Sequence, residues 1–130
     1  MNELSLKWEA NFETGHSEID KQHKYLFVLI KSFATSYMLK EEKEEITDML
    51  FELEDYTKTH FANEENILAK TKGLPSSRHL AQHRQFLKFL HDLKFDFISD
   101  NKPISEELLN YLVKWLRDHI LGIDKIELQQ

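Results

Sequence analysis

The chain of 130 residues contains no cysteine, and this absence removes several kinds of site at once. Disulfides, zinc fingers, iron–sulfur clusters and thiol nucleophiles all depend on cysteine. Glycine occurs three times and proline twice, which is too little for a disordered or an all-β protein. Together with 31% charged residues, this scarcity of turn-forming residues favours a helical chain.

Long apolar runs and basic clusters are also missing. No stretch of about 18 apolar residues occurs, so we expect no membrane-spanning helix. The N-terminal sequence MNELSLKWEA lacks the basic and apolar regions of a secretory signal. The formal net charge of −6 argues against nucleic-acid binding, because no run of lysine and arginine offsets it. We therefore expect a soluble, cytoplasmic protein with a single domain over residues 1–130.

Apolar residues recur at a spacing of three or four in four segments, which is the pattern of one α-helical face. The first segment runs from Ser17 to about Met38, and the second opens in the charged sequence KEEKEE. The sequence TKGLPSS separates the second segment from the third, and SDNKPIS separates the third from the fourth. The fourth is expected to end around Gly122, since glycine is common at helix ends.

The connections between these segments are short, so consecutive helices should be antiparallel neighbours. We therefore predict an all-α fold, an up-down-up-down antiparallel four-helix bundle over residues 17–124. Residues 1–16 form an N-terminal arm in this prediction, and Trp8 and Phe12 are expected to pack the arm against the bundle.

Seven polar residues occupy positions on the inward stripes of these helices where apolar residues are expected. They are His23, His60, Glu64, His79, His83, His119 and Asp124. In an antiparallel bundle, the starts of the first and third helices lie level with the ends of the second and fourth. The seven residues therefore converge on one layer, whereas His16 in the arm and His91 outside the stripe are interpreted as non-ligands.

Such a layer indicates a metal site. Residues four apart on a helix are neighbours, so His79 and His83 can bind one metal ion together. Buried without a cation, five imidazoles and two carboxylates would leave charges and lone pairs unpaired, at several kcal/mol each. Seven ligands are too many for one metal ion and fit two. Imidazole-rich ligation suits iron, copper, nickel or zinc rather than magnesium or calcium.

Members of the set also have simpler interpretations when taken alone. His60 and Glu64 are spaced as an ordinary helix pair, and Asp124 is typical of a solvated residue at a helix end. Asp124 also lies five residues after His119, which in a regular helix is a rotation of roughly 140°. Local unwinding near Gly122 would bring Asp124 inward, and the agreement of all seven positions favours the metal site.

Four motifs carry a resemblance to a known family. They are IDKQH ending in His23, HFANEE containing His60 and Glu64, HLAQH from His79 to His83, and HILGID from His119 to Asp124. With Trp8 in the arm, this pattern resembles the hemerythrin family, in particular its single-domain bacterial members, over nearly the whole chain. The resemblance implies a centre of two iron ions with an oxo or hydroxo bridge and no haem, which binds O2 reversibly.

The resemblance also implies a role for each ligand. In the implied arrangement one six-coordinate iron is completed by His79, His83 and His119, the other iron is held by His23 and His60, and both ions are bridged by Glu64 and Asp124. The second iron keeps an open position for O2.

Apolar side chains beside the open position would limit the access of water and protons. For this O2 pocket we nominate Leu26, Phe61, Trp115, Leu116 and Ile120, all of which also suit plain core packing. Five imidazoles and two carboxylates should donate less charge than a carboxylate-rich oxygenase site. This composition favours reversible binding over cleavage of the O–O bond.

The expected function is therefore O2 carriage, storage or delivery by a protein that is not an enzyme, and the sequence indicates no particular protein partner. One alternative is an O2- or redox-sensing signalling module, although no output domain is recognised in the sequence. A di-iron oxidase or peroxidase is a second alternative, but the paired Glu-x-x-His motifs of ferritin-like sites are absent. A structural zinc site is disfavoured, since zinc prefers four closed ligands.

Overall fold

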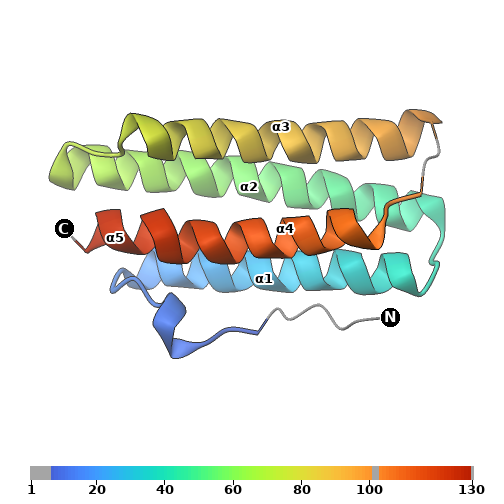
Figure 1. Cartoon of the computed structure of the whole chain (residues 1–130), viewed down its shortest axis with the longest axis horizontal. Helices are drawn as coiled ribbons and strands as arrows, with labels where there is room; N and C mark the ends of the chain where they lie inside the picture. Colours follow the sequence, from blue (N-terminus) through green and yellow to red (C-terminus); the bar gives the residue numbers. More distant parts are fainter. Residues whose placement is uncertain (1–6, 101–102, 130) are drawn as a thin grey trace.

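The computed structural model of the protein describes residues 7–100 and 103–129, and within them every regular element is helical. In chain order the elements are the 3-10 turn η1 (Ala10–Phe12), α1 (Ser17–Met38), α2 (Lys43–Lys72), α3 (Ser77–Asp100), α4 (Glu106–His119), the π-helical turn η2 (Ile120–Asp124) and α5 (Lys125–Leu128). Helices α1 to α4 run alternately up and down as neighbours (Figure 1). The predicted all-α four-helix bundle is therefore confirmed. None of the helices in the described part of the chain combines the length and apolar content needed to cross a bilayer.

Local signals set the ends of the helices. His16 caps α1, because its Nδ1 accepts a hydrogen bond from the Ile19 N–H at 3.4 Å. The Ser105 hydroxyl caps α4 by accepting from the Leu108 N–H at 3.1 Å. Helix α2 is terminated by its C-cap Gly73, whose φ of 65° lies in the left-handed region that favours glycine. These ends determine the height at which each residue of the inward stripes lies in the bundle.

The end of the fourth helix differs from the prediction. We expected it around Gly122, but the chain stays helical through η2 and α5 to Leu128. Gly122 is exposed, and a methyl group added there would meet nothing within 4 Å. Instead of ending the helix, this segment forms a π-helical turn in which the Lys125 N–H donates to the Ile120 carbonyl oxygen, five residues earlier.

The described part of the N-terminal arm, from residue 7 onward, packs against the bundle as predicted, whereas residues 1–6 of the predicted arm lie outside the described residues. Phe12 is 1% exposed, and its ring centroid lies 5.3 Å from that of Phe27 on α1. The Trp8 ring lies 5.5 Å from Phe12 and 5.4 Å from Phe27. Three aromatic rings therefore hold the arm against the first helix.

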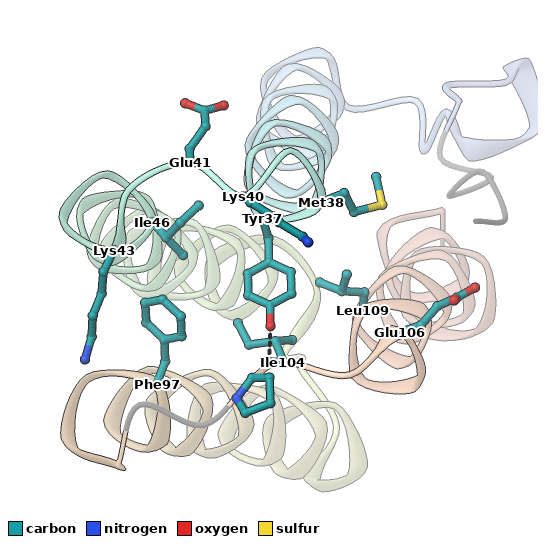
Figure 2. A pocket seen from close by; sticks show the side chains of 11 residues that line it. Tyr37, Met38, Lys40, Glu41, Lys43, Ile46, Phe97, Ile104, Glu106 and Leu109 are labelled. Carbon is teal, nitrogen blue, oxygen red and sulfur yellow. Dashed lines mark hydrogen bonds between the residues drawn. The ribbon is translucent and has the colours of Figure 1, made fainter.

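An apolar cavity of about 480 Å³ lies where α1 and α3 end and α2 and α4 begin. Its lining includes Ile46, Phe97, Ile104 and Leu109, and Figure 2 shows Tyr37 among them. The Tyr37 hydroxyl accepts a hydrogen bond from the Ile104 N–H. This contact ties the segment before α4 to the end of α1.

Replacing Tyr37 with phenylalanine is expected to lower the free energy of unfolding by about 1–3 kcal/mol, because the buried Ile104 N–H loses its acceptor. Tyr25→Phe is the matched control, since Tyr25 is 42% exposed and its hydroxyl donates to Glu52 at the surface. The control should change stability by less than about 0.5 kcal/mol. Urea unfolding compares the two variants, and equal losses would contradict this role for Tyr37.

Candidate metal centre

The seven polar residues of the inward stripes lie together at the other end of the bundle. Each is at most 3% exposed. They come from the start of α1, the end of α2, the start of α3 and the segment from the end of α4 through η2, all at one end in Figure 1. The structure thus brings together every residue that the sequence predicted as a ligand.

The seven residues form two overlapping groups, in each of which the potential ligand atoms lie within 4.8 Å of one another. The larger group consists of Glu64, His79, His83, His119 and Asp124, and the smaller group consists of His23, His60, Glu64 and Asp124. Glu64 and Asp124 belong to both groups. This is the arrangement expected when two metal positions share two carboxylates.

The Glu64 carboxylate faces both groups. Its Oε1 lies 3.2 Å from Nε2 of His79 and 3.2 Å from Nε2 of His83. Its Oε2 lies 3.6 Å from Nε2 of His23. One oxygen therefore points to the larger group and the other to the smaller group.

The Asp124 carboxylate is shared in the same way. Its Oδ1 lies 2.7 Å from Nε2 of His79 and 2.9 Å from Nε2 of His119. Its Oδ2 lies 3.1 Å from Nε2 of His23. Asp124 and Glu64 thus occupy equivalent places between the two groups.

The π-helical turn explains how Asp124 reaches this place. In a regular α-helix, Asp124 would be rotated by roughly 140° from His119, which lies five residues earlier. A π-helical turn pairs residues five apart, as in the hydrogen bond from the Lys125 N–H to the Ile120 carbonyl. The turn therefore returns Asp124 to the face of His119, where it is 1% exposed.

Four of the five histidines also have a partner on the outer side of the ring. Their Nδ1 atoms lie 2.6 Å from Gln22 Oε1 for His60, 2.9 Å from Glu127 Oε1 for His79, 2.7 Å from Glu65 Oε2 for His83, and 2.7 Å from Gln82 Oε1 for His119. An outer acceptor at Nδ1 orients the ring and leaves Nε2 for a metal. The sequence analysis missed all four partners.

A signal for three of these partners was present in the sequence. Gln22, Glu65 and Gln82 each stand next to a predicted ligand on their own helix and reach a ligand on the following helix. Glu127 lies one turn beyond Asp124, on α5. The predicted end of the fourth helix at Gly122 had placed Glu127 outside the bundle.

Several buried polar atoms of the cluster form no hydrogen bond of regular geometry among the described residues, although some of them lie 2.7–3.6 Å from another member of the cluster. They are both ring nitrogens of His23, Oε2 of Glu64 and both carboxylate oxygens of Asp124. Each unsatisfied buried polar atom costs about 1–3 kcal/mol, so the set is unfavourable unless something else binds it. A cation satisfies such lone pairs, and imidazole with some carboxylate is a donor set suited to iron. The residues present therefore fit a centre of two iron ions.

The carboxylates also control protonation of the histidines in the metal-free protein. Burial alone would lower the pKa of His23, but Asp124 and Glu64 raise it from 6.5 to about 9. Burial is likewise outweighed at His79, where Asp124 and Glu64 raise the pKa to about 10. Burial and the charge of His23 lower the pKa of His60 to about 4. Metal ions must displace the protons held on His23 and His79.

The metal-free protein is expected to be most stable near pH 6.5. Above this value, the contribution of His23 and His79 is lost as pH rises through their folded pKa values of about 9 and 10. Below it, His60 opposes folding, because its folded pKa of about 4 is under the unfolded value of 6.5. In metal-free protein, the midpoint of thermal unfolding should therefore decrease as the pH is raised above about 6.5. A midpoint that rises steadily to pH 10 would contradict these pKa shifts.

Aromatic rings cover the histidines. The Phe61 ring stacks on His83 with centroids 3.8 Å apart, and its centroid lies 5.8 Å from that of His60. The Trp115 ring stacks on His119 at 4.4 Å. Two of the five residues nominated for an O2 pocket therefore contact ligand rings.

The other three nominated residues, Leu26, Leu116 and Ile120, are buried in the apolar core of the bundle. Their part in an O2 pocket stays a prediction. His16 and His91 belong to neither ligand group. His16 caps α1, and the exposed His91 lies 3.4 Å from Glu54, away from the cluster.

Comparison with known proteins shows the family to which the chain belongs. Residues 14–130 match the family described as the hemerythrin HHE cation binding domain. The chain belongs to the hemerythrin family. This match confirms the resemblance carried by the four ligand motifs.

Other members of the hemerythrin family align along most of this chain. A bacteriohemerythrin from Clostridium acetobutylicum is 28% identical over 91% of this chain and 95% of its own length. One from Pseudomonas aeruginosa is 30% identical over 92% of this chain and 76% of its own length. A crystal structure of a hemerythrin with one leucine replaced by alanine is 25% identical, with a TM-score of 0.86 over 98% of this chain and 100% of that one.

Proposed function

We propose that this hemerythrin binds O2 reversibly at a centre of two non-haem iron ions and serves in O2 carriage, storage or delivery. Hemerythrins bind O2 at a di-iron site. The observation that carries the proposal is the pair of overlapping ligand groups that share Glu64 and Asp124. In this proposal the protein acts by binding and release, not as an enzyme.

The two groups would hold the two ions in different ways. His79, His83 and His119 would hold one iron, and His23 and His60 would hold the other, with both carboxylates common to the two. When bound, the irons supply a binding position for O2 and the electrons that its reversible binding requires. The smaller group offers one histidine fewer, so it is the position at which O2 would bind.

The surrounding residues favour binding and release over chemical turnover. The ligands are buried, and Phe61 and Trp115 lie flat against His83 and His119. This apolar cover excludes water and limits proton delivery to the centre. Five imidazoles and two carboxylates supply little negative charge, which opposes cleavage of the O–O bond.

An O2 cycling experiment tests this function. Protein reconstituted with ferrous iron under anaerobic conditions should develop a visible charge-transfer band when O2 is admitted, and the band should fade under vacuum over repeated cycles. Protein loaded with zinc is the control and should show no band. Steady O2 consumption with added reductant would instead indicate an oxidase or peroxidase. Irreversible oxidation in the first cycle would favour a redox sensor.

A further inference from the structure

The outer partners of the histidines are divided unequally between the two ligand groups. Glu127 and Glu65 supply carboxylate acceptors to His79 and His83 of the larger group. The smaller group has only the Gln22 carboxamide, on His60. His23 Nδ1 is buried and has no hydrogen-bond partner within residues 7–100 and 103–129.

We infer that Glu65 and Glu127 are positioning residues that make the two iron positions unequal, an inference that rests on the proposed di-iron centre. They strengthen His79 and His83 as donors, so the larger group binds its metal first and stabilises the ferric state more strongly. The smaller group has no outer carboxylate at Nδ1 of His23 or His60, so it is the weaker donor set.

The difference between carboxylate and carboxamide acceptors gives the physical reason. A hydrogen bond from an imidazole N–H to a carboxylate is charge-assisted and stronger than one to a neutral amide oxygen. The stronger bond draws the Nδ1 proton outward and raises the basicity of Nε2, the atom that faces the metal position. His119, with Gln82 as its partner, receives the weaker form of this effect.

Glu127 is held in place by contacts that fit this role. Its Oε2 accepts from the Ser76 hydroxyl at 2.6 Å, and its Oε1 accepts from the Ser76 N–H at 3.2 Å and lies 2.9 Å from His79 Nδ1. The Ser76 hydroxyl also accepts from the His79 N–H at 3.2 Å. Glu127 is 6% exposed, so its charge is poorly screened by solvent.

Glu65 fills the corresponding place at the solvent boundary. Its side chain is 33% exposed, and it follows Glu64, the shared carboxylate, directly along α2. Its Oε2 lies 2.7 Å from His83 Nδ1. The two outer carboxylates therefore reach the larger group from different helices, α2 and α5.

Charge-neutral replacements test the inference. Glu65→Gln and Glu127→Gln keep the size and the acceptor oxygen of each side chain but remove its charge. In a cobalt(II) titration of the metal-free protein, each variant should bind the first equivalent 10–100-fold more weakly, roughly the cost of losing a partner of this kind. Binding of the second equivalent should change little. Glu107→Gln, an exposed residue in the first turn of α4, controls for the loss of one charge.

The reverse substitution guards against variants that fail to fold. Gln22→Glu gives His60 the outer carboxylate that the smaller group lacks. The variant should therefore bind the second equivalent of cobalt(II) more tightly, and the difference between the two affinities should decrease. Circular dichroism confirms that each variant is folded.

The reduction potential of iron-loaded protein provides a second readout. A tenfold weaker preference for the ferric state raises a one-electron potential by about 59 mV. Glu65→Gln and Glu127→Gln should therefore raise the potential of one iron, and Gln22→Glu should lower that of the other.

Two failures are distinguishable. If wild-type protein binds two metal ions, and Glu65→Gln and Glu127→Gln bind them with unchanged affinities and unchanged reduction potentials, the positioning role is wrong and the proposed function stands. If wild-type protein does not bind two ions at all, the proposed function itself is wrong.

Discussion

Glu64→Gln should reduce bound iron from two ions per chain to less than one. Glu64 belongs to both ligand groups, with Oε1 facing His79 and His83 and Oε2 facing His23. A carboxamide of the same shape offers one neutral oxygen and an NH2 group that cannot bind a cation. Both positions therefore lose a ligand and a negative charge. Iron analysis after anaerobic reconstitution and desalting measures the loss.

His60→Ala separates the two positions. His60 belongs only to the smaller group, so this variant should retain about one iron per chain in the complete larger group. Glu44→Gln changes an exposed glutamate in the first turn of α2 and should retain two. Two irons in Glu64→Gln, or none in His60→Ala, would contradict the division into groups.

Inserting one alanine directly after Gly122 should remove Asp124 from the cluster. The π-helical turn of η2 places Asp124 five positions after His119 on the same face. A sixth residue adds roughly 100° of helical rotation. Asp124 would then point away from His79 and His23, and Glu127 would lose its contact with His79. We expect iron content to fall below one ion per chain.

Deleting Gly122 is the matched control and should have the opposite outcome. The deletion makes Asp124 the fourth residue after His119, and in a regular α-helix residues four apart share a face. The π-helical turn should become α-helical while Asp124 stays in the cluster. Iron content near two is expected. Equal loss in the insertion and the deletion would show that the helical register does not decide the position of Asp124.

The fold and the ligand cluster were predictable because the signals are local. Apolar spacing identified four helices, and the breakers TKGLPSS and SDNKPIS set their order and direction. With the ends known, the height of His23, His60 and His119 followed from antiparallel packing alone. All three histidines are buried at the expected end of the bundle.

The end of the fourth helix was not predictable from the same signals. Gly122 is a weak helix former and was interpreted as a terminus. In the structure its neighbours Ile120, Ile123 and Asp124 are buried, and the contacts of Asp124 with His79 come from another helix. Tertiary contacts of this kind override local propensity. The five-residue spacing from His119 to Asp124 indicated local unwinding near Gly122, but it did not indicate that the chain would stay helical beyond it.

The outer partners were missed for a different reason. Gln22, Glu65 and Gln82 each adjoin a predicted ligand, but adjacency alone does not distinguish them from ordinary surface residues. Each reaches its histidine only because the next helix packs beside it. Their role depends on the distance between two helices, and this distance cannot be inferred from the spacing of residues along one helix.

Diffraction from crystals of iron-loaded protein, measured at the iron absorption edge, is the most direct test of the centre. Two anomalous peaks are expected, one among His79, His83 and His119 and the other beside His23 and His60. Glu64 and Asp124 should contact both. A single peak, or two peaks with either carboxylate bound to only one of them, would contradict the shared two-metal site.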